Sequence, residues 1–230
     1  MQTTDLLILA VARLAGGLTI AGMTTERDEK TGLRWVRPIP EGGVWTPDDL
    51  RYSDGSLVQP GDVVRMALGA PQPSPPFVEN VAVGLQVRPL ERVRRLAPER
   101  RTAFFDEHLD QAPAEVLRER TRSLCLIRPD FVHAIVSWDS ETGKFETRLA
   151  LMVGRLKSNE EGIAVTDIYW RAFMRAWLGD EEYLEIDDSE LLSRLGELYA
   201  VVGLGRKGGP VILGIHTVPE YTAMIDEAAL

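Results

Sequence analysis

The sequence has few of the residues on which disulfide-rich and metal-dependent folds depend. It contains one cysteine, Cys125, and three histidines, His108, His133 and His216, in 230 residues. A single cysteine excludes an intrachain disulfide framework, and the apolar run 124–127 favours a buried thiol over a reactive one. The histidines lack the spacing of a metal site. We therefore expect neither a disulfide-stabilised secreted domain nor a metal centre.

Motifs for nucleotide cofactors and for membranes are also missing. The glycines between Gly203 and Gly209 do not match a dinucleotide fingerprint, and the chain has no Walker lysine motif. No apolar stretch approaches the length of a membrane span, and Met1–Asp5 lacks the positive region of a signal peptide. The sequence therefore predicts a cytoplasmic protein without a cofactor and without a membrane partner.

Basic residues are fewer than acidic residues in the chain as a whole, with 26 lysines and arginines against 35 aspartates and glutamates. The formal net charge is −9, which argues against general electrostatic adhesion to nucleic acid or to an anionic membrane. A local basic groove is still compatible with this sum, because binding depends on how the charges are distributed. The acidic side is concentrated in Asp180–Glu190, which holds seven carboxylates.

The first part of the chain has the pattern of a small β-barrel. Residues 1–88 contain five short apolar or alternating segments separated by turn signals, with no long helical pattern. The opening hairpin pairs Leu18–Met23 with Leu33–Ile39 through a charged turn that ends in Thr31-Gly32. Five strands are typical of an OB or SH3-like barrel.

Residues 89–122 have a different composition, rich in arginine. Helices are expected to begin at Pro98 and Pro113, because proline is favoured in the first helical turn. The arginines are interleaved with acids, so two interpretations stay open. In the first, the arginines form a ridge that faces phosphates. In the second, they form ion pairs with the neighbouring acids on a solvated helix.

From residue 123 the β pattern returns, with two helices inserted. Trp170, Phe173, Met174 and Trp177 share one face of a helix predicted over Ile168–Leu178, which indicates a core stripe. A second helix is expected from Asp188 through Tyr199. The predicted fold is mainly β with inserted helices (α+β): an OB-like barrel over 1–88, a helical connector over 89–122 and a second OB-like barrel over 123–230.

Short stretches in both halves resemble a known family. Leu7-Ile-Leu-Ala-Val11, Ile20-Ala-Gly22 and Arg34-Trp-Val-Arg-Pro38 resemble the N-terminal barrel of bacterial dual OB-domain proteins. Leu124-Cys-Leu-Ile-Arg-Pro129, Ala164-Val-Thr-Asp-Ile-Tyr-Trp-Arg171, Ala200-Val-Val-Gly-Leu-Gly205 and Ile212-Leu-Gly-Ile-His216 resemble the C-terminal one. The resemblance implies an OB-type nucleic-acid-binding role by analogy of fold. The acidic run Asp180–Glu190 departs from what a nucleic-acid groove needs.

Candidate binding residues lie in the second strand of the opening hairpin. Strand alternation places Trp35 and Arg37 on one face, and Arg34 and Val36 on the other. An aromatic ring beside a guanidinium suits stacking of a base and pairing with a phosphate. The alternative is a barrel-wall tryptophan next to a solvated arginine.

The last hairpin offers a second set of candidates. If the final two strands pair, His216 could lie near the turn that carries Arg206 and Lys207, and together they would suit a phosphate. A hairpin tip with solvated charges is the alternative. Asp167 precedes the helix 168–178 and is expected to be its N-cap.

Three functions are compatible with these patterns. The first is a non-enzymatic protein that binds single-stranded DNA or RNA through Trp35, Arg37, Arg206, Lys207 and His216. The second is an acidic scaffold that binds a basic or mixed-charge protein partner. The third is a small-barrel enzyme acting on a nucleotide with Asp167 and His216 as acid and base, which the lack of a paired site disfavours. Salt-dependent retention on single-stranded nucleic acid separates the first from the second.

Overall fold

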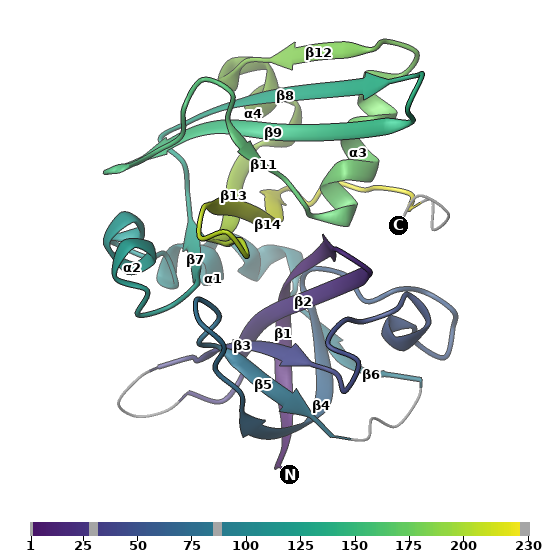
Figure 1. Ribbon diagram of the computed structural model, residues 1–230, viewed down its shortest axis with the longest axis vertical. Helices are drawn as coiled ribbons and strands as arrows, with labels where there is room; N and C mark the ends of the chain where they lie inside the picture. Colours follow the sequence, from purple (N-terminus) through teal and green to yellow (C-terminus); the bar gives the residue numbers. More distant parts are fainter. Residues whose placement is uncertain (1, 28–31, 85–88, 226–230) are drawn as a thin grey trace. The chain divides into compact units, whose positions relative to one another are not determined.

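A computed structural model describes residues 2–27, 32–84 and 89–225 of the chain (Figure 1). The chain divides into two compact units, residues 1–97 and residues 98–229. The helices expected in a separate connector over 89–122 belong to the second of these units.

The first unit is a closed five-strand β-barrel with an additional edge strand. The strands follow the order β1-β2-β3-β5-β4, and pairing of β4 with β1 closes the barrel. All described pairings in it are antiparallel except that of β3 with β5. The strands are β1 (Gln2–Leu14), β2 (Gly17–Thr24), β3 (Trp35–Ile39), β4 (Asp62–Pro71), β5 (Asn80–Val83) and β6 (Glu91–Arg95), with a 3-10 turn at Asp48–Leu50.

Apolar side chains and one glycine explain why these segments close into a barrel. Leu6, Ile8, Val36 and Val64 are fully buried, so adjacent strands contribute to one core. A β-bulge in β1 shifts the register opposite Gly22. A Cβ atom on Gly22 would lie 2.0 Å from the carbonyl oxygen of Leu7, so only glycine allows β1 and β2 to approach this closely.

The second unit contains two antiparallel sheets and four α-helices among its described residues. One sheet has the order β10-β9-β8-β12, with β11 also paired to β9, and the other has the order β14-β13-β7. A parallel bridge between Val165 and Ile212 joins the two sheets. The strands are β7 (Leu124–Ile127), β8 (Phe131–Asp139), β9 (Lys144–Val153), β10 (Leu156–Lys157), β11 (Ile163–Ala164), β12 (Tyr183–Ile186), β13 (Glu197–Leu204) and β14 (Pro210–Val218).

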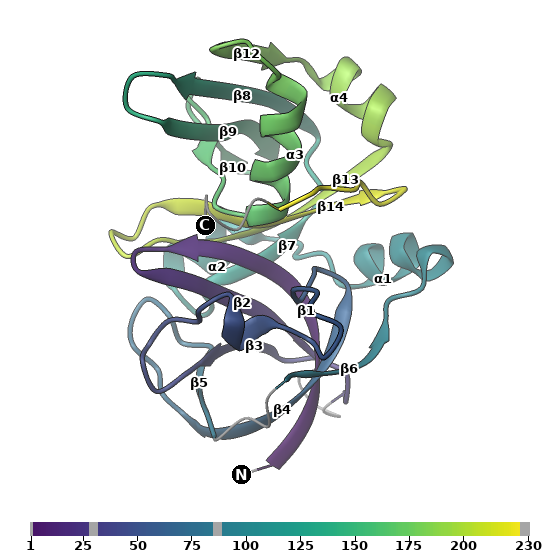
Figure 2. The same cartoon turned by 90° about the vertical axis from the view of Figure 1, so that its right-hand side faces the viewer.

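The helical elements are a 3-10 turn at Pro98–Arg100, α1 (Arg101–Glu107), α2 (Pro113–Glu119), α3 (Ile168–Leu178) and α4 (Asp188–Leu195). Helices α2, α3 and α4 contribute side chains to the core of this unit (Figure 2). Helix α3 has the bounds that its apolar stripe predicted, and Trp170 is 0% exposed in the core of this unit. Cys125 is buried in the same core, as its apolar neighbours predicted.

The structure corrects four of the sequence-based expectations. Residues 91–95 form strand β6 of the first unit rather than part of a helical connector. Strand β12 lies within the acidic run, where no strand was predicted. Helix α4 ends at Leu195, because the chain turns at Gly196 with a positive φ of 72°. Phe173 and Trp177 are half-buried, although their stripe predicted full burial.

No helix in the described part of the chain is long and apolar enough to cross a membrane.

The predicted turn at Thr31-Gly32 is described only in part, because Thr31 lies outside the described residues. The strands that flank this turn pair as predicted, with Met23 opposite Trp35.

Candidate nucleic-acid interface

Trp35 and Arg37 lie two residues apart in β3 of the first barrel. Trp35 is 4% exposed and Arg37 is 6% exposed. Stacking of a base on the Trp35 ring needs an accessible ring face, which this burial does not leave. The two side chains are therefore not the exposed pair that strand alternation suggested, because residues 35–38 of β3 are buried on both faces of the strand.

The side chain of Arg37 lies against the segment that leads into β5. Its guanidinium carbon is 4.5 Å from the centroid of the Phe77 ring, and its backbone N–H donates to the carbonyl of Glu79 at 2.9 Å. In the parallel pairing of β3 with β5, Arg37 is opposite Asn80. Burial lowers the pKa of Arg37, and the negative charge of Glu79 acts in the opposite direction.

Several buried polar atoms around Arg37 have no hydrogen-bond partner among the described residues. They are Nε1 of Trp35, Nε and Nη2 of Arg37, and Oδ1 of Asn80. A buried donor or acceptor without a partner costs about 1–3 kcal/mol, and more when it is charged. Three of these four atoms are donors, so this cluster lacks hydrogen-bond acceptors.

The loop between β4 and β5 supplies the aromatic contact to Arg37. Reciprocal backbone hydrogen bonds between Ser74 and Phe77, of 2.8 and 3.1 Å, close a tight turn in this loop. The run 71–75 is exposed, whereas Phe77 is half-buried over the guanidinium. Phe77 is thus the aromatic ring of this cluster that is partly accessible.

The turn between β13 and β14 in the second unit carries Arg206 and Lys207. Both side chains are exposed, and neither has a carboxylate partner among the described residues. Backbone hydrogen bonds within 205–209 fix the turn. Arg120, which follows α2, also approaches it: a Cβ atom on Gly208 would lie 3.4 Å from Nη2 of Arg120. We call Arg120, Arg206 and Lys207 the basic turn cluster.

Comparison with known protein families identifies the architecture. The family model described as "Dual OB-containing domain" matches residues 4–206. The chain belongs to this dual OB family. No curated protein and no solved structure matches the chain.

The dual OB assignment fits the strand order of the first barrel. A five-stranded barrel of order β1-β2-β3-β5-β4, closed by β1 and β4, is the arrangement of an OB-fold. OB-folds bind oligonucleotides on the face of strands 2 and 3 and on the flanking loops, including the loop between strands 4 and 5. Trp35 and Arg37 of β3 and Phe77 of the β4–β5 loop therefore lie where OB-folds in general carry ligand contacts.

His216 does not join the other candidates of this dual OB chain. Strands β13 and β14 pair as predicted, but His216 is opposite Tyr199, six residues into β14 from Pro210. At about 3.3 Å per residue this places it about 20 Å along the strand from the turn. The side chain is 1% exposed, and its ring centroid lies 4.8 Å from that of Phe105. The proposed proximity of His216 to Arg206 and Lys207 is wrong.

Asp167 is confirmed as the N-cap of α3. One carboxylate oxygen accepts the backbone N–H groups of Tyr169 and Trp170 at 2.8 and 3.2 Å, and the other accepts that of Ile215 at 2.7 Å. Full burial raises the pKa of Asp167 to about 7, and the three N–H donors act against this rise. Because both carboxylate oxygens accept backbone N–H groups, one of them from the distant strand β14, the carboxylate serves the fold.

Sequence reasoning missed three residues that the structure brings to these clusters. Phe77 follows a proline-rich loop, and Asn80 begins a short strand, so neither has a local signal of its own. Arg120 was one of many arginines in the segment 89–122, and only its left-handed backbone, with φ of 55°, distinguishes it. In the described part of the chain no group of three His, Cys, Asp or Glu side chains is arranged to hold a metal ion.

Proposed function

We propose that this protein is a non-enzymatic binder of single-stranded nucleic acid, and that the cluster around Arg37 in the first barrel receives a backbone phosphate. One observation carries the proposal: a guanidinium that is 6% exposed has two nitrogen atoms without acceptors, and two residues earlier in β3 the buried indole N–H of Trp35 also lacks one. A phosphate supplies several acceptor oxygens and a negative charge at once. Guanidinium–phosphate hydrogen bonds are among the stronger ones in proteins.

The roles of the aromatic residues differ from those that the sequence suggested. Trp35 donates its indole N–H to the phosphate, since its ring is buried. Phe77 is half-buried and packs on Arg37, so a base stacks on the outer face of this ring when the β4–β5 loop moves outward. Base–aromatic stacking contributes about 1–3 kcal/mol per base and does not depend strongly on sequence.

The basic turn cluster of the second unit provides a separate contact. Arg120, Arg206 and Lys207 have no carboxylate partners among the described residues, so their charges are available to phosphates. With a net charge of −9, the remaining surface repels nucleic acid. Binding is therefore confined to such local cations and weakens steeply with salt.

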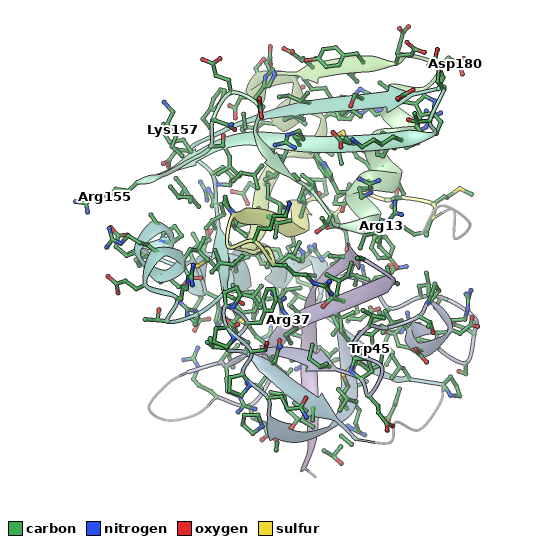
Figure 3. All side chains as sticks on the ribbon, in the orientation of Figure 1. Arg13, Arg37, Trp45, Arg155, Lys157 and Asp180 are labelled. Carbon is green, nitrogen blue, oxygen red and sulfur yellow. The ribbon has the colours of Figure 1, made fainter. Side chains whose placement is uncertain are left out.

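Fluorescence anisotropy with a labelled oligothymidylate and a labelled oligouridylate of roughly twenty nucleotides tests this function, because one OB-fold covers about 4–16 nucleotides. Arg37→Gln should reduce the slope of log affinity against log salt by about 0.7, the contribution of one phosphate contact on a single strand. Arg13→Gln, which removes an exposed arginine of the same barrel (labelled in Figure 3), should leave the slope unchanged.

Two further variants separate the roles of the aromatic residues. Phe77→Ala should weaken binding by about 1–3 kcal/mol with little change in the salt slope, because stacking releases no counterion. Trp35→Phe retains an aromatic ring but removes the indole N–H together with part of the ring volume, so it should weaken binding by about 1 kcal/mol, and circular dichroism melts must show that the barrel stays folded. Wild-type protein that binds neither oligonucleotide at low salt, where electrostatic attraction is largest, would show that the proposed function is wrong.

A further inference from the structure

The acidic run of the second unit contains a strand whose outer edge has no partner in the described structure. Strand β12 is the last strand in the sheet order β10-β9-β8-β12. Figures 1 and 2 both show it at the outer margin of this sheet, with no strand beyond it. The seven carboxylates of residues 180–190 therefore lie on and around a free sheet edge, and the proposed nucleic-acid binding assigns no role to them.

The hydrogen-bond register shows which backbone groups face outward. The backbone N–H of Trp138 in β8 donates to the carbonyl of Glu182 at 2.8 Å, and the same register places Val136 opposite Leu184. Hydrogen-bonded and non-hydrogen-bonded pairs alternate along an antiparallel ladder. The N–H and C=O groups of Tyr183 and Glu185 therefore point away from β8, toward the free edge.

The side chains of β12 divide in the same way between core and solvent. Ile186 is fully buried and Leu184 packs against the core, which anchors the strand. Tyr183 is 56% exposed, and its hydroxyl donates to the exposed carboxylate of Glu185. A second strand could thus pair with this edge without displacing any core side chain.

The charge along this edge is almost uncompensated. No lysine or arginine occurs between residues 176 and 193. The nearest arginines in sequence lie over indole rings, with Arg175 4.9 Å from the Trp138 ring and Arg194 3.9 Å from the Trp177 ring. Among the described residues, no lysine or arginine pairs with residues 180–190, and the imidazole Nε2 of His133 lies 3.4 Å from the carboxylate of Glu185.

An acidic edge of this kind discriminates between possible partners. Charged side chains on edge strands prevent pairing between copies of a protein. Two β12 edges would bring like charges together, so a second copy of this edge is disfavoured. An extended segment rich in lysine or arginine has the opposite charge and can make the backbone hydrogen bonds that the edge offers.

We propose that β12 is a docking edge for a basic, extended segment of a partner protein, which adds as a further strand beside Tyr183 and Glu185. The partner's backbone pairs with the outward N–H and C=O groups of these two residues. Its cationic side chains face Glu185 and the exposed carboxylates at the start of the run, Asp180 and Glu181 (Asp180 is labelled in Figure 3). This docking edge is independent of the Arg37 cluster and of the basic turn cluster.

The probe for this proposal is a labelled peptide of about eight residues in which lysine and valine alternate, titrated against the full-length protein. Asp180→Asn combined with Glu181→Gln should weaken peptide binding about threefold to tenfold at low salt, since each exposed charge pair contributes modestly. Glu160→Gln combined with Glu161→Gln changes the net charge equally, at two exposed positions outside the run. This control should leave the affinity within twofold.

Backbone pairing is tested separately from charge. Tyr183→Pro removes an outward N–H at the first residue of an edge strand, where proline is tolerated. It should weaken peptide binding about tenfold, whereas Tyr183→Ala, which retains the N–H, should lose less. Circular dichroism melts establish that each variant is folded.

Amide hydrogen exchange gives the decisive readout. In the free protein the amides of Tyr183 and Glu185 should exchange rapidly, while that of Leu184 is protected by β8. Peptide binding should protect the first two amides and leave the third unchanged. Peptide binding without this alternate protection would mean simple electrostatic adhesion and would overturn the proposal, as would an absence of binding. Dimerisation of the protein that protects the same amides would instead assign the edge to a second copy.

Discussion

Removal of the Asp167 carboxylate should destabilise the second unit more than removal of any exposed helix cap. Asp167→Ala takes away the N-cap of α3, which costs about 1 kcal/mol. It also leaves the buried N–H of Ile215 without an acceptor, at about 1–3 kcal/mol. Release of a buried carboxyl, whose pKa burial raises to about 7, offsets part of this loss. We expect a net destabilisation of about 2–3 kcal/mol near neutral pH.

Asp187 provides a matched control in the same unit. It is the N-cap of α4 and accepts the backbone N–H of Glu190 at 2.9 Å, but it is exposed, and its described hydrogen bonds lie within residues 187–190. Asp187→Ala should therefore cost only about 0.5–1 kcal/mol. Urea denaturation of both variants, followed by far-UV circular dichroism, measures the two changes. Equal losses for the two substitutions would refute the argument, because the Ile215 contact would then contribute nothing.

Three other predictions follow from burial and charge. Burial raises the pKa of Asp167 from 3.8 to about 7, so the folded state binds the proton of this carboxyl more tightly than the unfolded state does. The excess stability of wild type over D167A should therefore be largest below about pH 4 and should fall by up to about 1.4 kcal/mol per pH unit until about pH 7. A difference in urea melts that does not change with pH would contradict this. Trp170→Ala should lower the free energy of unfolding by about 3–5 kcal/mol as a core truncation, whereas Trp177→Ala, at a half-buried position, should lower it by about 1–2 kcal/mol. Equal melting temperatures of the two variants would refute the core assignment of Trp170. Arg37→Met removes two buried donors without acceptors but also the positive charge that acts on the buried Glu79, so it should change the stability of the first barrel by no more than about 1–2 kcal/mol while it abolishes the phosphate contact; a larger loss in thermal melts would show that Arg37 serves the fold.

The elements that the sequence predicted well are those whose own apolar pattern matches the final environment. The stripe on 168–178 gave the bounds of α3, and the apolar run 124–127 gave those of β7. Both segments face the core of the second unit along their whole length. Local pattern and tertiary packing agree here, so either one is sufficient to assign the element.

Two of the strands that the sequence missed, β6 and β12, are charged edge strands. Strand β6 reads Glu-Arg-Val-Arg-Arg and lies in an arginine-rich segment that favours a helical prediction. It forms because it pairs with β4, where Arg95 meets the fully buried Asp62 at 2.6 Å. Strand β12 forms in an acidic run because Leu184 and Ile186 reach the core beside β8. In both strands, long-range pairing outweighs local propensity.

Pairing of two strands also does not determine how far apart their residues lie. The sequence indicated that the last two strands form a hairpin, and β13 and β14 do pair. The distance from His216 to the turn follows from its place in β14: six residues at about 3.3 Å each separate it from Pro210, whichever register the pairing takes. The separation in sequence, rather than the pairing, therefore decides that His216 lies far from Arg206 and Lys207.

The Arg37 cluster shows the corresponding limit for binding residues. Alternation correctly separates two faces of β3, but it assumes that one of them meets solvent. In this barrel both faces are buried, so the same pattern places a guanidinium where water cannot satisfy it. A buried arginine with two guanidinium nitrogens that lack acceptors is unfavourable for folding alone. A bound anion would supply the missing acceptors and so explain why an arginine occupies this buried position. Arg37, which alternation placed on an exposed face, is therefore the residue that best supports a phosphate contact in the first barrel.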